Sequence, residues 1–573
     1  MPKLHASRLL LTLVALALTA CTGGPPEPSG PELRVIRLDQ ALQESPEETG
    51  FGGGGGATHA VLIDRIHELA ADKDVKGLLL ELGELQGAWA RAADLRSALL
   101  AVRKAGKPIH CFLEGSDNLG YAVLARVCDR ISMSPAGILD VVGVSAEALY
   151  ARELLDSLGL RADFVQIGRF KGAADTATRD DMPEEVRQTI SALLDDLQGE
   201  LVAAVAERRK LTPADAQALI DRGPFTSEQA RAEGLVDDVG FDDAARAVAK
   251  KAAKAERVET EELEPEAEPT GLFDVLDALL GDDDSEEPSG ERLVLAHLDG
   301  TIMVGADKSF RSAHARPFVK AMRKFADDKD VKAVVLRIDS PGGSVLASDM
   351  MWHALRRVAK RKPVIVSIGD MAASGGYYVA SAGSEIIAQD LSIIGSIGVV
   401  GGKIVVEDLA KRVGVHVERL ARGRRAGWTS AAHAFTEDER SMFQKALQSG
   451  YDRFLARIAE GRKMTRERIT PLAEGRIMSA RRAQQGGLID RLGGLRDALA
   501  RARERGGLDA DAPTQVWPER PTLLQAIAQL TSGGSQVLQT SLLSAQPLGG
   551  FAELLLAGEA SQAAVMPFLL SLH

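Results

Sequence analysis

Residues 328–343 read DKDVKAVVLRIDSPGG and residues 72–87 read DKDVKGLLLELGELQG, so one stretch of sequence occurs twice in the chain. In each copy a short apolar run follows the shared DKDVK and leads to a helical pattern and a Lys-Pro step, at 107–108 and at 362–363. The offset between the copies stays at 255 or 256 residues throughout. Short apolar strands that alternate with helices indicate βα units with buried, largely parallel strands. The sequence therefore predicts an α/β protein built by tandem duplication.

The composition is that of a soluble globular protein large enough for more than one domain. The chain has 573 residues, of which 45% are hydrophobic and 26% are charged. These values exclude a wholly disordered, collagenous or multi-spanning membrane chain. The formal net charge of -12 argues against binding to nucleic-acid phosphates, so no nucleic-acid partner is expected. The sequence has no metal motif and no phosphate-binding glycine loop, so no metal and no cofactor are expected.

The two copies and the composition between them predict the domain boundaries. The first repeat is expected over residues 57–249 and the second over residues 291–500. Residues 250–290 are acidic and contain proline, which is typical of a linker. Residues 501–573 are expected to form a tail, which from Pro521 onward is apolar, contains leucines and has little charge, and we expect it to pack on the body or on a neighbouring subunit. Contact with a membrane or a substrate is the alternative, although none of its apolar runs is long enough to span a bilayer.

The N-terminus predicts export and a lipid anchor. Residues 1–20 contain basic residues, an apolar run and then small residues, which is the layout of a signal peptide. Cys21 follows in a Leu-Thr-Ala-Cys sequence that resembles the bacterial lipobox, so we expect it to be acylated and to anchor the protein to a lipid bilayer. A plain secreted protein is the alternative. Residues 21–56 provide a tether and the first strand region.

The two remaining cysteines, Cys111 and Cys128, allow two interpretations. An exported protein meets an oxidising compartment, where the two thiols can form a disulfide. The alternative is that both are small buried hydrophobic residues.

The second copy carries a serine that the first copy lacks. Residues 339–344 read DSPGGS, and such a Pro-Gly-Gly turn at a strand end exposes backbone N–H groups, as an oxyanion-binding loop requires. Residues 369–377 read GDMAASGGY, which places the Ser374 hydroxyl among small residues that let a substrate approach. The first copy has Asn118 at the matching position. Ser374 is therefore a candidate nucleophile.

A serine nucleophile needs a base, which is usually a histidine and otherwise a desolvated lysine. Residues 168–173 align without gaps on residues 423–428, and this places Lys171 opposite Ala426. One copy thus has the lysine without the serine, and the other has the serine without the lysine. This complementary loss predicts one composite site between the repeats. The second copy also has five histidines, none of which stands in a motif: His297, His314, His353, His416 and His433.

Four motifs together resemble a known family. They are FKGAADTATRDDM at 170–182, DSPGG at 339–343, AASGGY at 372–377 and GSIGVVG at 395–401. In this order they resemble the long, duplicated form of the signal peptide peptidase A (protease IV) family, whose members are Ser/Lys serine proteases of the Clp/crotonase fold. The resemblance covers roughly residues 33–500. It implies a tandem duplication of a Clp/crotonase-like α/β fold, with two similar domains in one chain.

The resemblance also implies a role for each site residue. Ser374 is the nucleophile, Lys171 is the general base that accepts and returns the proton, and Ser396 orients the lysine. The first copy has Val141 at the position of Ser396. The candidate oxyanion donors are the backbone N–H groups of two glycines, Gly343 and Gly375. The family further implies a bowl-shaped homotetramer whose apolar interior faces the membrane.

The predicted function is that of a serine endopeptidase of the bacterial cell envelope, lipid-anchored and facing the periplasm, which cleaves apolar peptides such as remnant signal peptides. A general envelope protease for misfolded chains or lipoproteins is the nearest alternative. A non-catalytic lipoprotein scaffold is disfavoured because both Ser374 and Lys171 are present. Acyl-CoA chemistry of the crotonase type does not need these residues on opposite repeats, and its substrate is cytoplasmic.

Overall fold

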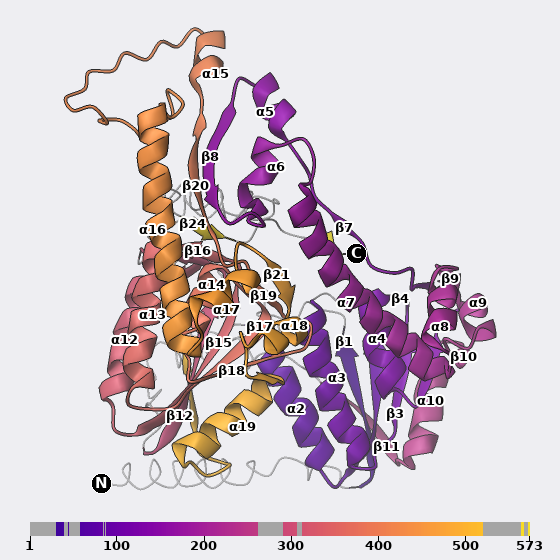
Figure 1. The fold of residues 1–573 in the computed structure, drawn as a ribbon. Helices are drawn as coiled ribbons and strands as arrows, with labels where there is room; N and C mark the ends of the chain where they lie inside the picture. The colour runs from indigo at the N-terminus through magenta and orange to yellow at the C-terminus, as the bar shows by residue number, and fades with distance from the viewer. Residues whose placement is uncertain are drawn as a thin grey trace, which may run out of the picture.

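In the computed structural model, the two halves of the chain form two similar α/β domains that share a third sheet (Figure 1). The structure describes residues 30–38, 44, 58–83, 85, 88–261, 290–305 and 312–518 and, as backbone alone, 563–565 and 571–572. The predicted signal peptide and Cys21 lie outside the described residues, as do most of the predicted linker and tail.

The first domain is built on a parallel sheet with the strand order β10-β5-β3-β2-β1-β11. Its strands are β1 (Glu32–Leu38), β2 (Val75–Leu82), β3 (Ile109–Leu113), β5 (Arg130–Met133), β10 (Asp238–Val239) and β11 (Arg257–Glu261). Its main helices are α2 (His59–Ala71), α3 (Trp89–Lys104), α4 (Asn118–Val127), α7 (Glu184–Arg209) and α10 (Asp242–Ala253). Leu78 and Leu80 of β2 pack toward α2, α3 and α4, whereas Leu79 packs toward α10. Because helices cover both faces, successive residues of the central strands, such as Leu78, Leu79 and Leu80, are apolar and buried.

The second domain repeats this plan. Its strands are β12 (Arg292–Asp299), β15 (Val331–Ser340), β17 (Val364–Ala373), β18 (Glu385–Ala388), β22 (Arg491–Leu492) and β23 (Thr514–Trp517). They pair in the order β22-β18-β17-β15-β12-β23, which matches the first sheet strand for strand. Its main helices are α12 (Ala315–Asp327), α13 (Val345–Ala359), α16 (Glu437–Arg462) and α19 (Leu495–Gly506). The predicted duplication of an α/β fold is confirmed.

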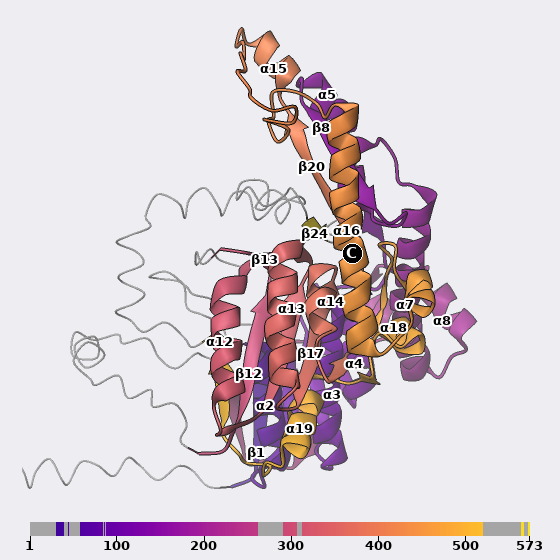
Figure 2. The same ribbon diagram turned by 60° about the vertical axis from the view of Figure 1, so that its left-hand side comes forward.

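The third sheet crosses from one domain to the other. Strand β8 (Arg161–Ile167) of the first domain pairs antiparallel with β20 (Val399–Val405) of the second over the whole length of both strands. Figures 1 and 2 show the two strands rising together from the body, with α5 (Arg152–Ser157) and α15 (Glu407–Arg412) at the tip and α16 beside them. This pairing carries the lysine-bearing segment that follows β8 onto the second domain.

Two strands lie beyond the predicted domain boundaries. Strand β11 falls inside the predicted linker, and β23 falls inside the predicted tail. The linker prediction is therefore wrong for residues 250–261, since these residues finish α10 and form β11. Acidic residues can stand in an edge strand when they find partners, and Glu261 pairs with Arg65 at 2.6 Å. The tail prediction is likewise wrong for residues 501–518, because β23 closes the second sheet beside β12.

Two short strands of the tail pair with the body. Strand β24 (Ala563–Val565) lies between β16 (Gly342–Ser344) and β20 in the third sheet, antiparallel to both. Strand β25 (Ser571–Leu572) pairs antiparallel with β7 (Ala146–Glu147). The described part of the tail therefore extends sheets of the folded body.

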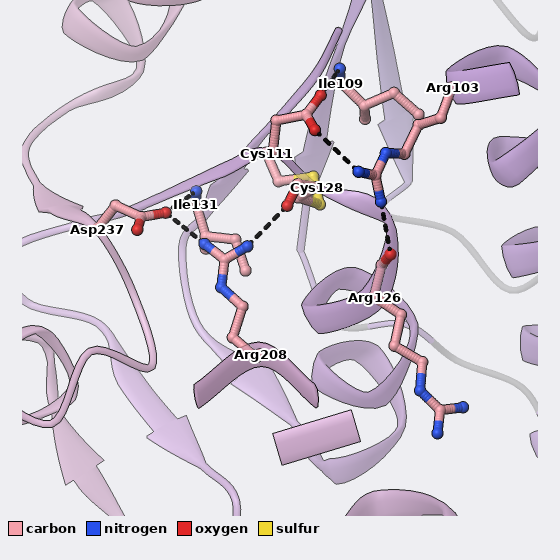
Figure 3. The surroundings of a disulfide bond; sticks show 9 residues. Arg103, Ile109, Cys111, Arg126, Cys128, Ile131, Arg208 and Asp237 are labelled. Atoms are coloured by element: carbon pink, nitrogen blue, oxygen red, sulfur yellow. Dashed lines mark hydrogen bonds and ion pairs between the residues drawn. A yellow bond between two sulfur atoms is a disulfide. The ribbon is translucent and has the colours of Figure 1, made fainter. Parts of the chain in front are cut away.

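Cys111 and Cys128 form a disulfide (Figure 3). It joins β3 to the C-terminal end of α4, and the two Cα atoms are 5.9 Å apart. Arg208 of α7 donates a hydrogen bond to the Cys128 carbonyl at 2.7 Å and also pairs with Asp237. Of the two interpretations of these cysteines, the structure selects the disulfide.

Candidate active site

Ser374 stands where β17 ends and the short helix α14 (Gly375–Ala380) begins. Its backbone has φ 55° and ψ -113°, a conformation that a non-glycine residue adopts only where the surrounding structure enforces it. The Ser374 N–H donates to the Gly395 carbonyl at 2.7 Å, which ties this turn to β19 (Ile393–Gly395). The side chain is fully buried. The turn therefore holds one hydroxyl in a fixed position at the end of a central strand.

Lys171 reaches this serine from the other domain. Its Nζ lies 2.7 Å from the Ser374 Oγ, across 203 residues of sequence. The same Nζ donates to the Ser396 carbonyl at 2.9 Å and lies 2.8 Å from the Ser396 Oγ. The lysine is fully buried, and burial holds its pKa well below the usual value because desolvation penalises the ammonium form.

These three contacts match the hydrogen-bonding capacity of a neutral amine. A carbonyl oxygen can only accept, so one N–H of Lys171 points to the Ser396 carbonyl. The second N–H can point to the Ser396 hydroxyl. The lone pair is then left for the proton of the Ser374 hydroxyl. The geometry therefore suits a lysine that takes a proton from Ser374.

Ser396 lies in the turn between β19 and β20, also with a left-handed backbone, φ 52°. Gly398, two residues later, has no room for a side chain, because a Cβ there would lie 3.1 Å from the Lys171 Cδ. The GSIG motif therefore supplies both the hydroxyl that contacts the lysine and the space for its side chain.

The two candidate oxyanion glycines are neighbours. Gly343 lies in β16, the strand that follows the Pro-Gly-Gly turn, and its φ of 157° suits glycine. A Cβ on Gly375 would lie 3.0 Å from the Gly343 nitrogen and 2.6 Å from the Ser348 Oγ. Only glycine at 375 lets the start of α14 approach β16 so closely. The backbone of both glycines therefore stands beside Ser374.

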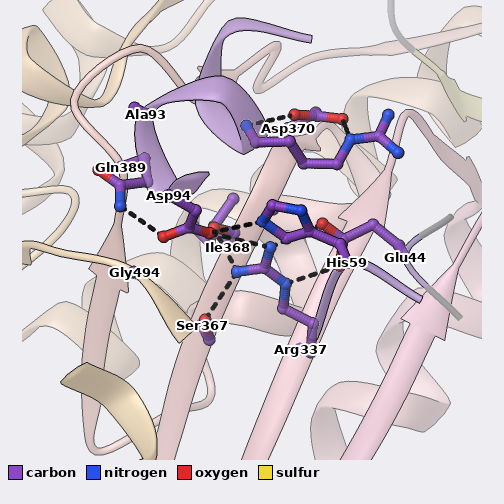
Figure 4. Close-up of polar contacts among 12 residues, drawn as sticks. Glu44, His59, Ala93, Asp94, Arg337, Ser367, Ile368, Asp370, Gln389 and Gly494 are labelled. Carbon is purple, nitrogen blue, oxygen red and sulfur yellow. Dashed lines mark hydrogen bonds and ion pairs between the residues drawn. The ribbon is translucent and has the colours of Figure 1, made fainter. Parts of the chain in front are cut away.

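A buried charge cluster joins the two domains near these strands (Figure 4). Arg337 of β15 donates hydrogen bonds to Glu44 of the first domain at 2.6 and 2.9 Å, and another to Ser367 at 3.0 Å. Asp94 of α3 lies 3.6 Å from the same guanidinium. Burial alone would raise the pKa of Glu44, but the charge and hydrogen bonds of Arg337 outweigh it and lower that pKa to about 2.

The same cluster reaches the two strands that lead into the site. Arg91 of α3 pairs with Asp370 of β17, and the Arg91 backbone N–H donates to that carboxylate at 3.2 Å. Asp339 of β15 accepts a hydrogen bond from the Met371 N–H at 3.1 Å. Burial raises the pKa of Asp370, and burial together with the Asp370 charge raises the pKa of Asp339. The cluster thus ties β15 and β17, the strands that lead to Gly343 and Ser374, to the first domain.

The five histidines of the second copy take other places. His297 is buried on β12, where desolvation lowers its pKa to about 4, and Glu44 and Arg337 also act on it. His353 and His416 are exposed, and His433 pairs with Glu439 at 3.6 Å. His314 is partly buried at the end of β14 (Ser312–His314). Lys171 is the basic side chain that contacts the Ser374 hydroxyl.

Within the described ranges, no group of three or more His, Cys, Asp or Glu side chains is placed to hold a metal ion. The same part of the chain contains no helix with the length and apolar character needed to cross a bilayer.

The sequence did not reveal two parts of this site. One is the charge cluster, whose partners are too far apart in sequence to form a pattern. The other is the turn at 474–476, which packs directly on Lys171. Its Glu-Gly pair signals a turn, but nothing in the sequence alone connects it with the lysine.

The sequence matches two family models. Residues 101–256 and 356–509 match the model of peptidase family S49, and residues 293–390 match the Clp protease model. Lys171 lies in the first S49 match, and Ser374 and Ser396 lie in the second.

Three relatives align over most of the chain. Protease 4 of Haemophilus influenzae is 31% identical over 460 residues, which are 77% of this chain and 72% of the relative. Protease 4 of Salmonella typhi is 29% identical over 503 residues, 84% of this chain and 78% of the relative. The chloroplastic serine protease SPPA of Arabidopsis thaliana is 28% identical over 483 residues, 83% of this chain and 70% of the relative.

Proposed function

The chain belongs to peptidase family S49 and is a serine protease, and from that premise we propose that Lys171 and Ser374 form its catalytic pair across the two domains. The observation that carries this proposal is the 2.7 Å contact between the Lys171 Nζ and the Ser374 Oγ, buried from solvent. The proposal gives one active site to each chain, assembled from both repeats.

In the proposed mechanism, neutral Lys171 takes the hydroxyl proton as the Ser374 Oγ attacks a peptide carbonyl carbon. The new C–O bond forms and the carbonyl oxygen becomes an oxyanion. The C–N bond then breaks, and the Lys171 ammonium returns its proton to the leaving amine. Water then attacks the ester carbonyl carbon while Lys171 takes a proton from it. The bond between this carbon and the Ser374 Oγ breaks, the carboxylic acid product leaves, and the Lys171 ammonium returns its proton to the Ser374 Oγ.

The backbone N–H groups of Gly343 and Gly375 are the proposed oxyanion donors. Fixed N–H groups that face a developing negative charge stabilise it without reorganisation. The close approach of the two glycines supports this role, because a side chain at 375 would force them apart.

We propose that substrates are extended apolar peptides, such as remnant signal peptides. The support comes from β24, which pairs antiparallel with β16 at Gly343 and with β20 at Val400. An extended segment of the chain thus fits between these two strands, beside the proposed oxyanion donors. The sequence of that segment, Ala-Ala-Val, is small and apolar.

The catalytic pair is tested by labelling the protein with a fluorophosphonate probe and locating the adduct by peptide mass mapping. We expect Ser374 to be labelled in the wild type and unlabelled in Ser374→Ala and Lys171→Ala. The matched control is Lys403→Ala, which removes another buried lysine of the third sheet, one that bonds the Trp428 and Ser430 carbonyls. This control should keep its labelling.

Labelling that survives Lys171→Ala would mean that another group is the base. A folded wild type that is not labelled at all would contradict the assignment of Ser374 as nucleophile.

We further propose that the protein is exported and lipid-anchored through Cys21 in the bacterial envelope, facing the periplasm. The disulfide between Cys111 and Cys128 supports an oxidising compartment. Cys21→Ser should release the protein from the membrane fraction, and intact-mass measurement of the wild type should find an acylated N-terminus. A wild type that fractionates as a soluble protein would overturn the anchor.

We propose that copies assemble head to tail, and a tetramer is the size that the family resemblance favours. Within one chain, β8 of the first domain pairs with β20 of the second. By the offset of 255, the matching segments are residues 416–422 and 144–150. The segment at 416–422 is exposed and carries the apolar side chains of Val417 and Leu420, which are 60% and 95% exposed, and Leu149 of the other segment is 73% exposed. A second copy could pair the two segments as β8 and β20 pair, and repeating this contact closes a ring.

Leu420→Asp tests the assembly. It should convert the oligomer of the wild type into smaller species in light-scattering measurements and leave the far-UV circular dichroism unchanged. An oligomer that persists would place the interface elsewhere.

A further inference from the structure

Strained backbone gathers around Lys171. Among the described residues, six that are not glycine have a positive φ: Lys210, Lys254, Ser374, Ser396, Lys463 and Glu474. The three lysines are the C-caps of α7, α10 and α16, where left-handed geometry is common. The other three lie in the segments that contact Lys171 or its neighbours. Such strain persists only where the surrounding structure enforces it, and it concentrates at functional sites.

Glu474 belongs to a turn that connects the lysine segment with the GSIG segment. The Phe170 N–H donates to the Glu474 carbonyl at 2.8 Å, so the turn holds the residue before Lys171. The Gly475 N–H donates to the Ile397 carbonyl at 2.8 Å, and the Ser396 N–H donates to the Arg476 carbonyl at 2.5 Å. The three consecutive residues 474–476 thus form hydrogen bonds with the lysine segment of the first domain and with the GSIG segment of the second domain.

Packing at this turn leaves no space for a side chain. A Cβ on Gly475 would lie 2.3 Å from the Lys171 nitrogen and 2.5 Å from its Cα. From the other side, a Cβ on Gly168 would lie 2.7 Å from the Glu474 carbonyl carbon. Both glycines have a positive φ, 89° and 108°. The backbone of the turn therefore touches the backbone of Lys171 directly.

Side chains hold the same contact from outside. Arg169 pairs with Glu474 at 2.8 Å, and the Arg476 guanidinium lies 3.5 Å from the centre of the buried Phe170 ring. Tyr451 of α16 accepts a hydrogen bond from the Glu474 N–H at 3.3 Å, which anchors the turn to the second domain.

We propose that residues 474–476 are a positioning turn that fixes the Lys171 backbone. In this position the lysine amine reaches both Ser374 and Ser396 and is shielded from water. The turn acts through Lys171 and does not itself contact substrate. The proposal rests on the proposed catalytic pair.

The test compares Gly475→Ala with Gly487→Ala. Gly487 is the C-cap of α18 (Ala480–Gly486) and has a similar positive φ, 83° against 89°, but a Cβ there would meet its nearest atom, a Met464 sulfur, only at 3.8 Å. Both substitutions place alanine at a positive φ, and only Gly475→Ala is expected to displace the lysine.

We expect Gly475→Ala to slow fluorophosphonate labelling of Ser374 by ~100-fold, because small misplacements of a catalytic group cost about that much. Gly487→Ala should stay within about twofold of the wild type, since it touches no part of the site. The pH at which the labelling rate is half-maximal should also rise in Gly475→Ala, because a displaced lysine regains water and its pKa moves back toward the usual value. A merely structural role would lower the folded fraction and leave that pH unchanged.

If Gly475→Ala does not fold, Arg476→Ala replaces it, because it keeps the backbone of the turn and removes only the contact with Phe170. Roughly tenfold slower labelling with the same upward shift in pH is expected. A wild-type rate and pH dependence in whichever of the two variants folds would overturn the positioning role.

Lys171→Ala is measured in parallel to separate the two proposals. If it labels like the wild type, the catalytic pair itself is wrong. If it is unlabelled while Gly475→Ala behaves as the wild type, only the positioning turn is wrong.

Discussion

The two domains share one sheet plan but end its third strand differently. In the second domain that strand, β17, delivers Ser374 to Lys171. In the first domain the matching residue is Asn118, whose side chain donates to the Gly143 carbonyl at 3.0 Å and accepts from the Val142 N–H at 3.0 Å. The Asn118 amide thus bonds the loop after Val141. The matching loop of the second domain contains Ser396, which contacts Lys171. The first domain thus uses its polar side chain at this position for hydrogen bonds within its own loops. The second domain presents a hydroxyl there to Lys171.

What the domains have in common is scaffold. Three pairs of matched residues make the same contact in both: Tyr121 and Tyr377, Lys107 and Lys362, Asp237 and Asp490. Each tyrosine donates to a leucine carbonyl, each lysine donates to carbonyls at a helix end, and each aspartate accepts a strand N–H. These contacts explain why the DKDVK region, the Lys-Pro step and a Gly-Leu-x-Asp sequence, at 234–237 and 487–490, occur twice. These shared residues therefore maintain the fold, whereas the difference at Asn118 and Ser374 concerns the candidate site.

The largest expected difference in stability between matched positions is at Arg337, whose counterpart in the first domain is Glu81. Arg337→Met leaves Glu44 and Asp94 buried without their cation, and we expect a loss of about 3–5 kcal/mol in the free energy of unfolding, measured by chemical denaturation. In the first domain, Arg37→Met removes a half-exposed partner of Glu81 at 3.0 Å and should cost less than about 1 kcal/mol. Equal losses in the two variants would mean that water reaches the cluster.

The disulfide is the next largest difference. By the offset of 255, the second domain has Val366 and Gly383 at the positions of Cys111 and Cys128. A Cβ on Gly383 would lie 2.5 Å from a Val366 methyl, so close packing replaces the covalent bond there. Replacing both cysteines by alanine should cost about 3 kcal/mol, because the bridge restricts the unfolded chain and its sequence separation of 17 residues corresponds to a loss of about that size.

Amide hydrogen exchange of the double cysteine variant shows which part of the molecule is destabilised. Faster exchange should appear in β3 and α4 and should be absent from β17 and α14. A reductant should lower the melting temperature of the wild type and leave the double variant unchanged. Faster exchange in both domains would show that their stabilities are not independent.

The smallest expected effect is an increase in the free energy of unfolding when Lys171 is replaced. Burial lowers the pKa of Lys171 in the folded protein, whereas in the unfolded chain the lysine has its ordinary pKa of about 10.4. The unfolded state therefore binds more protons, and stability should rise with pH from the lowered pKa up to about 10.4. Lys171→Met should remove that slope and stabilise the protein at pH 7 by about 1–2 kcal/mol, as loss of a strained functional group often does.

Thermal unfolding of both proteins from pH 6 to pH 10 measures this difference. A destabilised Lys171→Met variant, or a slope equal to that of the wild type, would contradict the pKa of Lys171 that burial imposes.

Much of this architecture could be predicted, because duplication made the chain its own control. The apolar runs at 78–82 and 334–338 correctly placed two central strands, and the gapless alignment of Lys171 on Ala426 singled out the lysine that the structure brings to Ser374. Long-range ion pairs could not be predicted. Arg337 and Glu44 are 293 residues apart, and the acidic β11 looked like linker because its arginine partners are distant in sequence.

The distance of 203 residues between Lys171 and Ser374 has a consequence for biosynthesis. A chain is made from its N-terminus and its domains generally fold in that order. The first domain is complete while the strand that carries Ser374 has not yet been synthesised. With the catalytic pair proposed above, a nascent chain lacks a complete site until its second domain has folded against its first. The division of the site between two repeats thus delays proteolytic activity until the second domain has been synthesised.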